Sequence, residues 1–116
     1  MLDERRTIRH RPVIYLKVFE QDSGNLIGRV VDISDRGLML VTDQPMESGS
    51  RLHLRFHPPQ DWQAPEPVLF EAEVRWSRPE ANPDLHDVGL VVVDPSPDYQ
   101  QAVDRLIAGY VFSEKA

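Results

Sequence analysis

The segment Arg51-Leu52-His53-Leu54-Arg55-Phe56 decides the fold class of this chain. Its residues alternate strictly between charged or polar and apolar, which is the period of a β-strand with one buried and one exposed face. The segment Phe70-Glu71-Ala72-Glu73-Val74-Arg75-Trp76 alternates in the same way. Two half-buried strands are therefore predicted, with Phe70, Ala72, Val74 and Trp76 facing inward.

Four further segments, on either side of these two, have the composition of strands. They are Val13–Phe19, Leu26–Ser34, Leu38–Thr42 and Val88–Val93, all rich in β-branched and other apolar residues. Clusters of Gly, Pro, Asp, Asn and Ser separate the segments and mark turns and loops. Six short strands at this spacing are typical of a small antiparallel β-barrel, so the predicted class is mainly β.

The last segment changes to a helical period. Ser96-Pro97-Asp98 combines a capping hydroxyl, a proline at the first helical position and an acid in the first turn. Apolar residues then recur on one helical stripe at Tyr99, Ala102, Val103, Leu106, Ile107 and Tyr110. We expect one domain over 1–116, with an N-terminal arm (1–11), a barrel (12–94) and a C-terminal helix (96–112) packed on the barrel.

Composition limits the possible functions. The chain has 116 residues, a net charge of −6 and no cysteine, which excludes disulfides, thiolate metal sites and cysteine nucleophiles. No apolar run is long enough to span a membrane, and no secretory signal is visible, so we expect a cytoplasmic protein. The acidic balance argues against binding to long DNA or RNA, because affinity for a polyanion depends on neutralising its phosphates.

Two local motifs indicate a binding site for a small anion. The arm contains four arginines, Arg5, Arg6, Arg9 and Arg11, within seven residues. Guanidinium groups offer paired donors that match phosphate oxygens and the O6/N7 edge of guanine. The second motif, Asp32-Ile33-Ser34-Asp35-Arg36-Gly37, places a carboxylate and a hydroxyl in a tight turn between two predicted strands. Together they indicate a pocket for an anionic ligand that contains guanine.

In order and spacing the two motifs resemble those of the PilZ domain, a bacterial receptor module for cyclic di-GMP. Arg5-Arg6-Thr7-Ile8-Arg9 matches the R-x-x-x-R of that family, and Asp32–Gly37 matches its [D/N]-x-S-x-x-G. The stretches ending in Val74-Arg75-Trp76 and Val88-Gly89-Leu90 resemble its closing strands. The resemblance covers nearly the whole chain. It implies a protein that binds cyclic di-GMP and signals to a partner protein when its flexible arm becomes ordered.

The resemblance also implies a role for each site residue. Arg5 and Arg9 would clamp phosphates and guanine edges, with Arg6 as a third contact. Asp32 would accept hydrogen bonds from guanine N1–H and N2–H₂, and Ser34 would support the same base or a phosphate. Gly37 would permit the turn and a close approach of the backbone. Arg11 and Trp76 are weaker candidates, and Trp76 would flank the ligand if it lay at the barrel mouth.

Several alternatives stay open. The domain could be a PilZ-like adaptor that works only through protein contacts, or Asp32 and Ser34 could simply satisfy their own turn. A barrel that binds single-stranded nucleic acid is disfavoured by the acidic charge. His53 and His57 lack a third metal ligand, and His86-Asp87 lacks a nucleophile, so we expect neither a metal, a cofactor nor an enzyme. The sequence leaves ligand stoichiometry open, and we expect a monomer or weak dimer.

Overall fold

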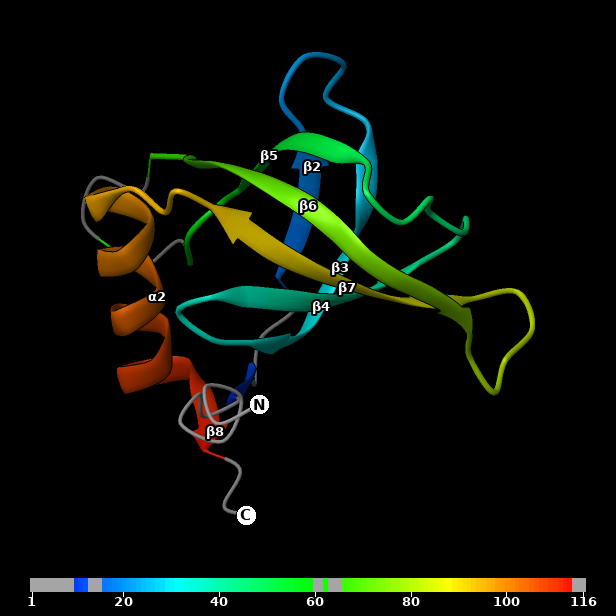
Figure 1. The fold of residues 1–116 in the computed structure, drawn as a ribbon. Helices are drawn as coiled ribbons and strands as arrows, with labels where there is room; N and C mark the ends of the chain where they lie inside the picture. Colours follow the sequence, from blue (N-terminus) through cyan, green and yellow to red (C-terminus); the bar gives the residue numbers. More distant parts are fainter. Residues whose placement is uncertain (1–9, 13–15, 60–61, 63–65, 114–116) are drawn as a thin grey trace.

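The computed structural model describes residues 10–12, 16–59, 62 and 66–113, and its centre is a closed antiparallel barrel (Figure 1). Six strands follow one another in the order β2-β5-β6-β7-β4-β3, and pairing of β3 with β2 closes the ring. Their bounds are β2 Lys17–Glu20, β3 Leu26–Ile33, β4 Gly37–Thr42, β5 Arg51–Phe56, β6 Val68–Pro79 and β7 His86–Val93. The predicted mainly-β class and the six-stranded barrel are confirmed.

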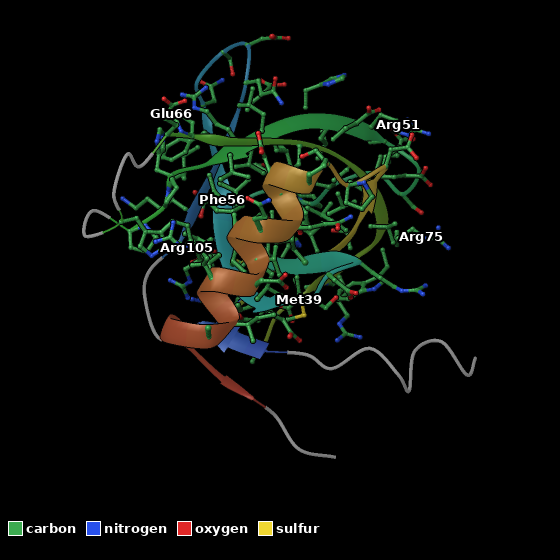
Figure 2. All side chains as sticks on the ribbon, turned by 90° about the vertical axis from the view of Figure 1, so that its left-hand side faces the viewer. Met39, Arg51, Phe56, Glu66, Arg75 and Arg105 are labelled. Carbon is green, nitrogen blue, oxygen red and sulfur yellow. The ribbon has the colours of Figure 1, made fainter. Side chains whose placement is uncertain are left out.

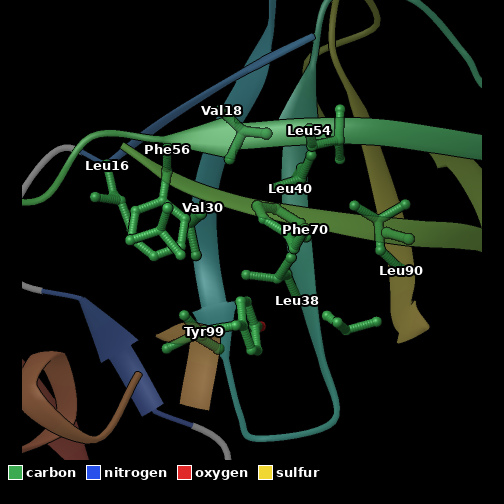
Figure 3. Close-up of a cluster of buried hydrophobic side chains, with 14 of the residues drawn as sticks. Leu16, Val18, Val30, Leu38, Leu40, Leu54, Phe56, Phe70, Leu90 and Tyr99 are labelled. Carbon is green, nitrogen blue, oxygen red and sulfur yellow. The ribbon is translucent and has the colours of Figure 1, made fainter. Parts of the chain in front are cut away.

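The barrel core is formed by the inward residues of these strands. Leu54 and Phe56 of β5 are fully buried, whereas Arg51 and His53 are exposed, as the alternation predicts. Figure 3 shows the cluster that these side chains build with residues from every other barrel strand. The members labelled there are Leu16, Val18, Val30, Leu38, Leu40, Leu54, Phe56, Phe70, Leu90 and Tyr99.

The helix α2 (Pro97–Tyr110) packs along one side of the barrel (Figure 1). The Ser96 hydroxyl accepts a hydrogen bond of 3.1 Å from the Tyr99 N–H, so the predicted N-cap is confirmed. The apolar stripe lies inward: Tyr99, Ala102, Val103 and Leu106 are buried. The Tyr99 ring lies 5.3 Å from that of Phe70, which connects the helix to β6. Among the described helical residues, no segment is long and apolar enough to cross a bilayer.

Two short strands at the chain ends extend the barrel, and the sequence did not predict them. β1 (His10–Pro12) pairs with β3 and with β8 (Val111–Ser113), all antiparallel. His10 and Arg11 are therefore strand residues and not part of a free arm, and the helix ends at Tyr110, two residues earlier than predicted. Gly109 weakens the last helical turn, and Val111 favours extended structure, so pairing with β1 determines the outcome.

Trp76 does not face inward, contrary to the prediction. The pairing of β6 with β7 shifts register between Val74 and Trp76, which marks a β-bulge at Arg75. A bulge adds one residue to a strand and reverses the alternation beyond it. Trp76 consequently pairs with Gly89 on the outer face and is only half-buried, while Phe70, Ala72 and Val74 are buried as predicted.

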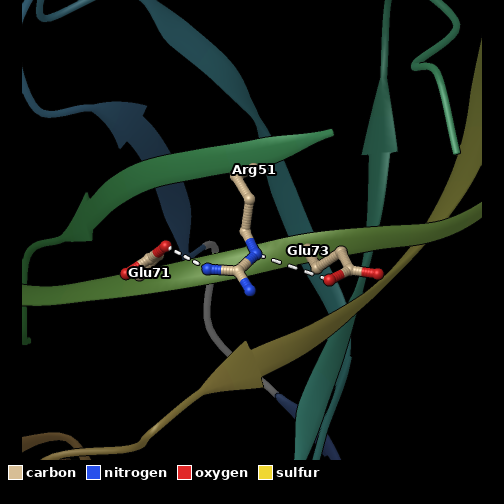
Figure 4. A network of polar contacts seen from close by, with 3 residues as sticks. All are labelled: Arg51, Glu71 and Glu73. Atoms are coloured by element: carbon tan, nitrogen blue, oxygen red, sulfur yellow. Dashed lines mark hydrogen bonds and ion pairs between the residues drawn. The ribbon is translucent and has the colours of Figure 1, made fainter. Parts of the chain in front are cut away.

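The outer face of β5 and β6 is charged. Arg51 lies between Glu71 and Glu73 and donates hydrogen bonds of 2.7 Å and 3.4 Å to their carboxylates (Figure 4). These bonds raise the pKa of the already basic Arg51 guanidinium further. All three side chains are substantially exposed, so this network contributes little to stability but occupies the donors of Arg51.

Candidate functional site

The turn between β3 and β4 carries the Asp32–Gly37 motif. The Ser34 N–H donates to the Gly37 carbonyl at 2.9 Å, and the Arg36 N–H donates to the Ser34 hydroxyl at 3.3 Å. Ser34 is only 9% exposed. Its hydroxyl therefore holds the turn in shape, as in an ST-turn, and the turn presents its neighbours to solvent as a fixed surface.

Gly37 is required by a close approach between strands and not by the turn conformation. The φ angle of Gly37 does not lie in the left-handed region. In the described chain, the glycines with a positive φ are Gly24 and Gly49. A Cβ at position 37 would instead overlap the carbonyl oxygen of Leu90 on the adjacent strand β7. Of the two roles predicted for Gly37, close backbone approach is the one that this geometry supports.

Asp32 belongs to a row of residues that crosses four neighbouring strands. It pairs with Met39 of β4, Met39 pairs with Gly89 of β7, and Gly89 pairs with Trp76 of β6. Directly paired residues of an antiparallel sheet point to the same face, and here that face is the outside of the barrel. We call these four residues the Asp32–Trp76 row. It connects the two candidate site residues that the sequence placed 44 positions apart.

The absence of a side chain at Gly89 shapes this row. A Cβ at position 89 would overlap the indole of Trp76, so the ring occupies the space above the β7 backbone. The guanidinium carbon of Arg78 lies 4.6 Å from the centroid of the same ring. Sequence reasoning missed Met39, Gly89 and Arg78. A glycine inside an apolar strand often marks a close approach of this kind, and Gly89 could have been found by that signal.

The attachment point of the arginine arm lies beside the motif. His10 pairs with Ile33, the residue between Asp32 and Ser34. Arg9 directly precedes His10 in the chain. Arg5, Arg6 and Arg9 themselves lie outside the described residues, and Arg11 is placed only as a backbone position in β1, paired with Phe112 of β8. The residue that directly follows the R-x-x-x-R segment therefore lies at the edge of the Asp32 turn.

Tyr99 connects α2 to the same turn. It is fully buried, and its hydroxyl has no hydrogen-bond partner in the described part of the chain. Burial raises the pKa of Tyr99, and the negative charge of Asp35, within the motif, raises it further.

Replacing Tyr99 by phenylalanine should stabilise the protein by about 1 kcal/mol, because a buried hydroxyl without a partner carries a desolvation cost. In the unfolded chain tyrosine ionises near pH 10, whereas the raised pKa keeps Tyr99 neutral in the fold. The wild type should thus lose stability above about pH 10, and the phenylalanine variant should lose less. Urea denaturation at pH 7 and pH 10.5 measures both effects. Equal or lower stability of the variant at both values would contradict this assignment.

The histidines do not assemble into a metal site in the described chain. β5 ends at Phe56, so His57 lies just beyond the strand, and its ring lies edge-on to Phe19 with ring centroids 5.5 Å apart. Among described residues, no group of three or more His, Cys, Asp or Glu side chains could hold a metal ion.

A small barrel with a fixed polar turn, a cationic segment attached beside it and a capping helix defines a class of regulatory domains. The family model of the PilZ domain matches residues 3–109, so the chain belongs to the PilZ domain family. PilZ domains are receptor and adaptor domains, and nothing in the described chain indicates catalysis. No curated protein matches the chain by sequence.

Three solved structures with the same fold belong to two proteins. The inhibitor of motility from Bacillus subtilis (MotI/DgrA) aligns with a TM-score of 0.70 at 20% identity, over 90% of this chain and 49% of that one. The PilZ domain of YcgR from Escherichia coli, solved with c-di-GMP, aligns with a TM-score of 0.65 at 14% identity. The alignment covers 91% of this chain and 90% of that domain. The structure of YcgR from Escherichia coli in complex with c-di-GMP aligns with a TM-score of 0.65 at 17% identity. That alignment covers 90% of this chain and 44% of the YcgR chain. This chain thus spans about half of the first and less than half of the last.

Proposed function

We propose that this protein binds cyclic di-GMP between its arginine arm and the Asp32 turn, and relays binding to a partner protein. The observation that carries the proposal is the pairing of His10 with Ile33, because His10 directly follows the R-x-x-x-R segment in the sequence and Ile33 lies between Asp32 and Ser34. Membership of the PilZ family and the likeness in fold to a YcgR domain solved with c-di-GMP support it. The protein would act in the bacterial cytoplasm without turning the ligand over.

Each group would meet the part of the ligand that its chemistry suits. Arg5 and Arg9, with Arg6 beside them, would donate to phosphate oxygens and to guanine O6 and N7 through paired N–H groups. Asp32, half-buried on the outer face, would accept from guanine N1–H and N2–H₂. Ser34, whose hydroxyl is used within the turn, would act mainly by fixing the position of Asp32 and its neighbours.

The route of the signal would start at β1. An arm that folds over the ligand is continuous with β1, and β1 pairs with β8, which directly follows α2. Ordering of the arm would therefore change the stability of the β1–β8 pair and of the helix end. An order–disorder change of this type is a common switching device. The partner would recognise the arm, β8 or α2 in the bound state.

Isothermal titration with cyclic di-GMP tests the proposal, with Asp32→Ala as the site variant. Loss of hydrogen bonds to a charged acceptor costs about 1.5–3 kcal/mol, so affinity should fall about 10- to 150-fold. Asp35→Ala is the matched control: it removes the same charge from an exposed position in the same turn and should bind within about 3-fold of wild type. No heat with wild-type protein at tens of micromolar would overturn the proposal.

The second candidate is an adaptor that binds no nucleotide. The likeness in fold to an inhibitor of motility favours it, as does an exposed apolar position, Leu26, which is 55% exposed. Leu26 lines a small pocket of about 110 Å³ together with Lys17, Arg29 and Val41. A variant lacking Arg5 and Arg9 separates the two candidates in cells: an adaptor would keep its activity, and a receptor would lose it.

A further inference from the structure

We infer that Arg78 is a second guanine-recognition residue, which contacts the base farthest from Asp32. The inference rests on the proposed function and extends it to a residue outside the R-x-x-x-R and Asp32–Gly37 motifs. Its basis is the position of the Arg78 guanidinium over Trp76, at the opposite end of the row from Asp32.

The geometry of β6 brings Arg78 to the site. Because of the bulge at Arg75, Trp76 and Arg78 both lie on the outer face, two residues apart on the same strand. The indole covers Gly89, and the guanidinium carbon lies 4.6 Å from the ring centroid, within the range of a cation–π contact. This contact holds the guanidinium plane at the end of the row without using its N–H groups.

The donors of Arg78 remain available for a ligand. In the part of the chain that the structure describes, Arg78 makes no hydrogen bond and no ion pair, although Asp87 lies opposite it in register. Arg51, on the neighbouring strand β5, differs from Arg78 because its N–H donors are bound to the carboxylates of Glu71 and Glu73. An exposed guanidinium that is positioned by an aromatic ring and has free donors suits bidentate contact with guanine O6 and N7.

The length of the row separates Arg78 from Asp32. Three strand spacings of about 4.8 Å place Trp76 about 14 Å from Asp32 along the sheet. One guanine cannot contact both ends of such a surface. Arg78 therefore serves a different base from the one that Asp32 serves, either the second guanine of the same ligand molecule or a guanine of a stacked second molecule.

Titration of Arg78→Ala with cyclic di-GMP tests this inference, and Arg75→Ala is the matched control. Both arginines are exposed residues of β6 and both changes remove one positive charge, but Arg75 is the bulge residue and points away from the barrel (Figure 2). We expect Arg78→Ala to lower affinity about 10- to 100-fold and Arg75→Ala to change it less than about 3-fold. Arg78→Lys keeps the charge but loses the planar fork, and should be intermediate.

A second readout locates the effect at the indole. In a Trp62→Phe background Trp76 is the remaining tryptophan of the chain, and the bound guanine beside it should quench its fluorescence. Quenching should weaken at saturation when Arg78 is alanine. Wild-type binding with equal affinities and equal quenching in the Arg78 and Arg75 variants would overturn this inference while leaving the proposed function intact. No binding by the wild type would overturn both.

Discussion

Replacing Arg5 and Arg9 together by alanine should lower the affinity for cyclic di-GMP by at least about 100-fold. Each residue is expected to make a bidentate, charge-assisted contact of about 1.5–3 kcal/mol with a phosphate or a guanine edge, so the two contacts together contribute about 3–6 kcal/mol. Both residues precede β1 in the chain, and the described barrel core is built from Leu16 onward. The melting temperature without ligand should therefore stay within about 1 °C of wild type.

The matched control for this double variant is Arg75→Ala with Arg105→Ala. It removes the same charge from two exposed positions, one on the outer side of β6 and one on α2, which Figure 2 shows on opposite sides of the molecule. A general electrostatic effect would lower affinity equally in both double variants, whereas a specific clamp lowers it only in the arm variant. Equal affinities in isothermal titration would contradict the role of the arm.

Replacing Gly37 by alanine should destabilise the fold by about 2–3 kcal/mol. The added Cβ would overlap the Leu90 carbonyl, and relief requires separation of β4 from β7, which pair over six residues from Gly37 to Thr42. Overpacking against backbone is costly because neither strand can rotate away as a flexible side chain could. The change also displaces the Asp32 turn, so binding should weaken together with stability.

Gly109→Ala is the control for this glycine. A Cβ at position 109 meets nothing within 4 Å, and alanine is the better helix former, so the variant should be as stable as wild type or slightly more so. Urea denaturation of the two variants measures the difference. Similar urea midpoints for Gly37→Ala and Gly109→Ala would show that the close approach of β4 to β7 does not require a glycine at position 37.

Much of this fold could be predicted from local patterns. The alternation of Arg51–Phe56 gives the inner and outer faces of β5, and Ser96 gives the start of α2 through its hydroxyl. These features depend on residues close in sequence, whose spacing directly reflects the period of a strand or helix. The chemistry of the arginine segment and the Asp32 turn, together with the family resemblance, predicted that they form one site, and the pairing of His10 with Ile33 is consistent with this prediction.

The features that could not be predicted from the sequence depend on pairing between segments that are distant along the chain. The bulge at Arg75 leaves no mark in the alternation of Phe70–Trp76, yet it moves Trp76 to the outer face. β1 and β8 are three-residue strands that depend on pairing with each other and, in the case of β1, with β3 as well. The Asp32–Trp76 row exists only once the register of four strands is known, so the placement of Arg78 could not be anticipated.

The measurement that tests the central claim most directly is an NMR titration of isotope-labelled protein with cyclic di-GMP. The proposed site predicts shifts of the Gly37 amide in the turn, and of the Asp32 amide and the Trp76 indole N–H at opposite ends of the Asp32–Trp76 row. The amide of His53, on the outer face of β5, should not move. Shifts confined to β5, or none at saturating ligand, would contradict a cyclic di-GMP site at the Asp32 turn.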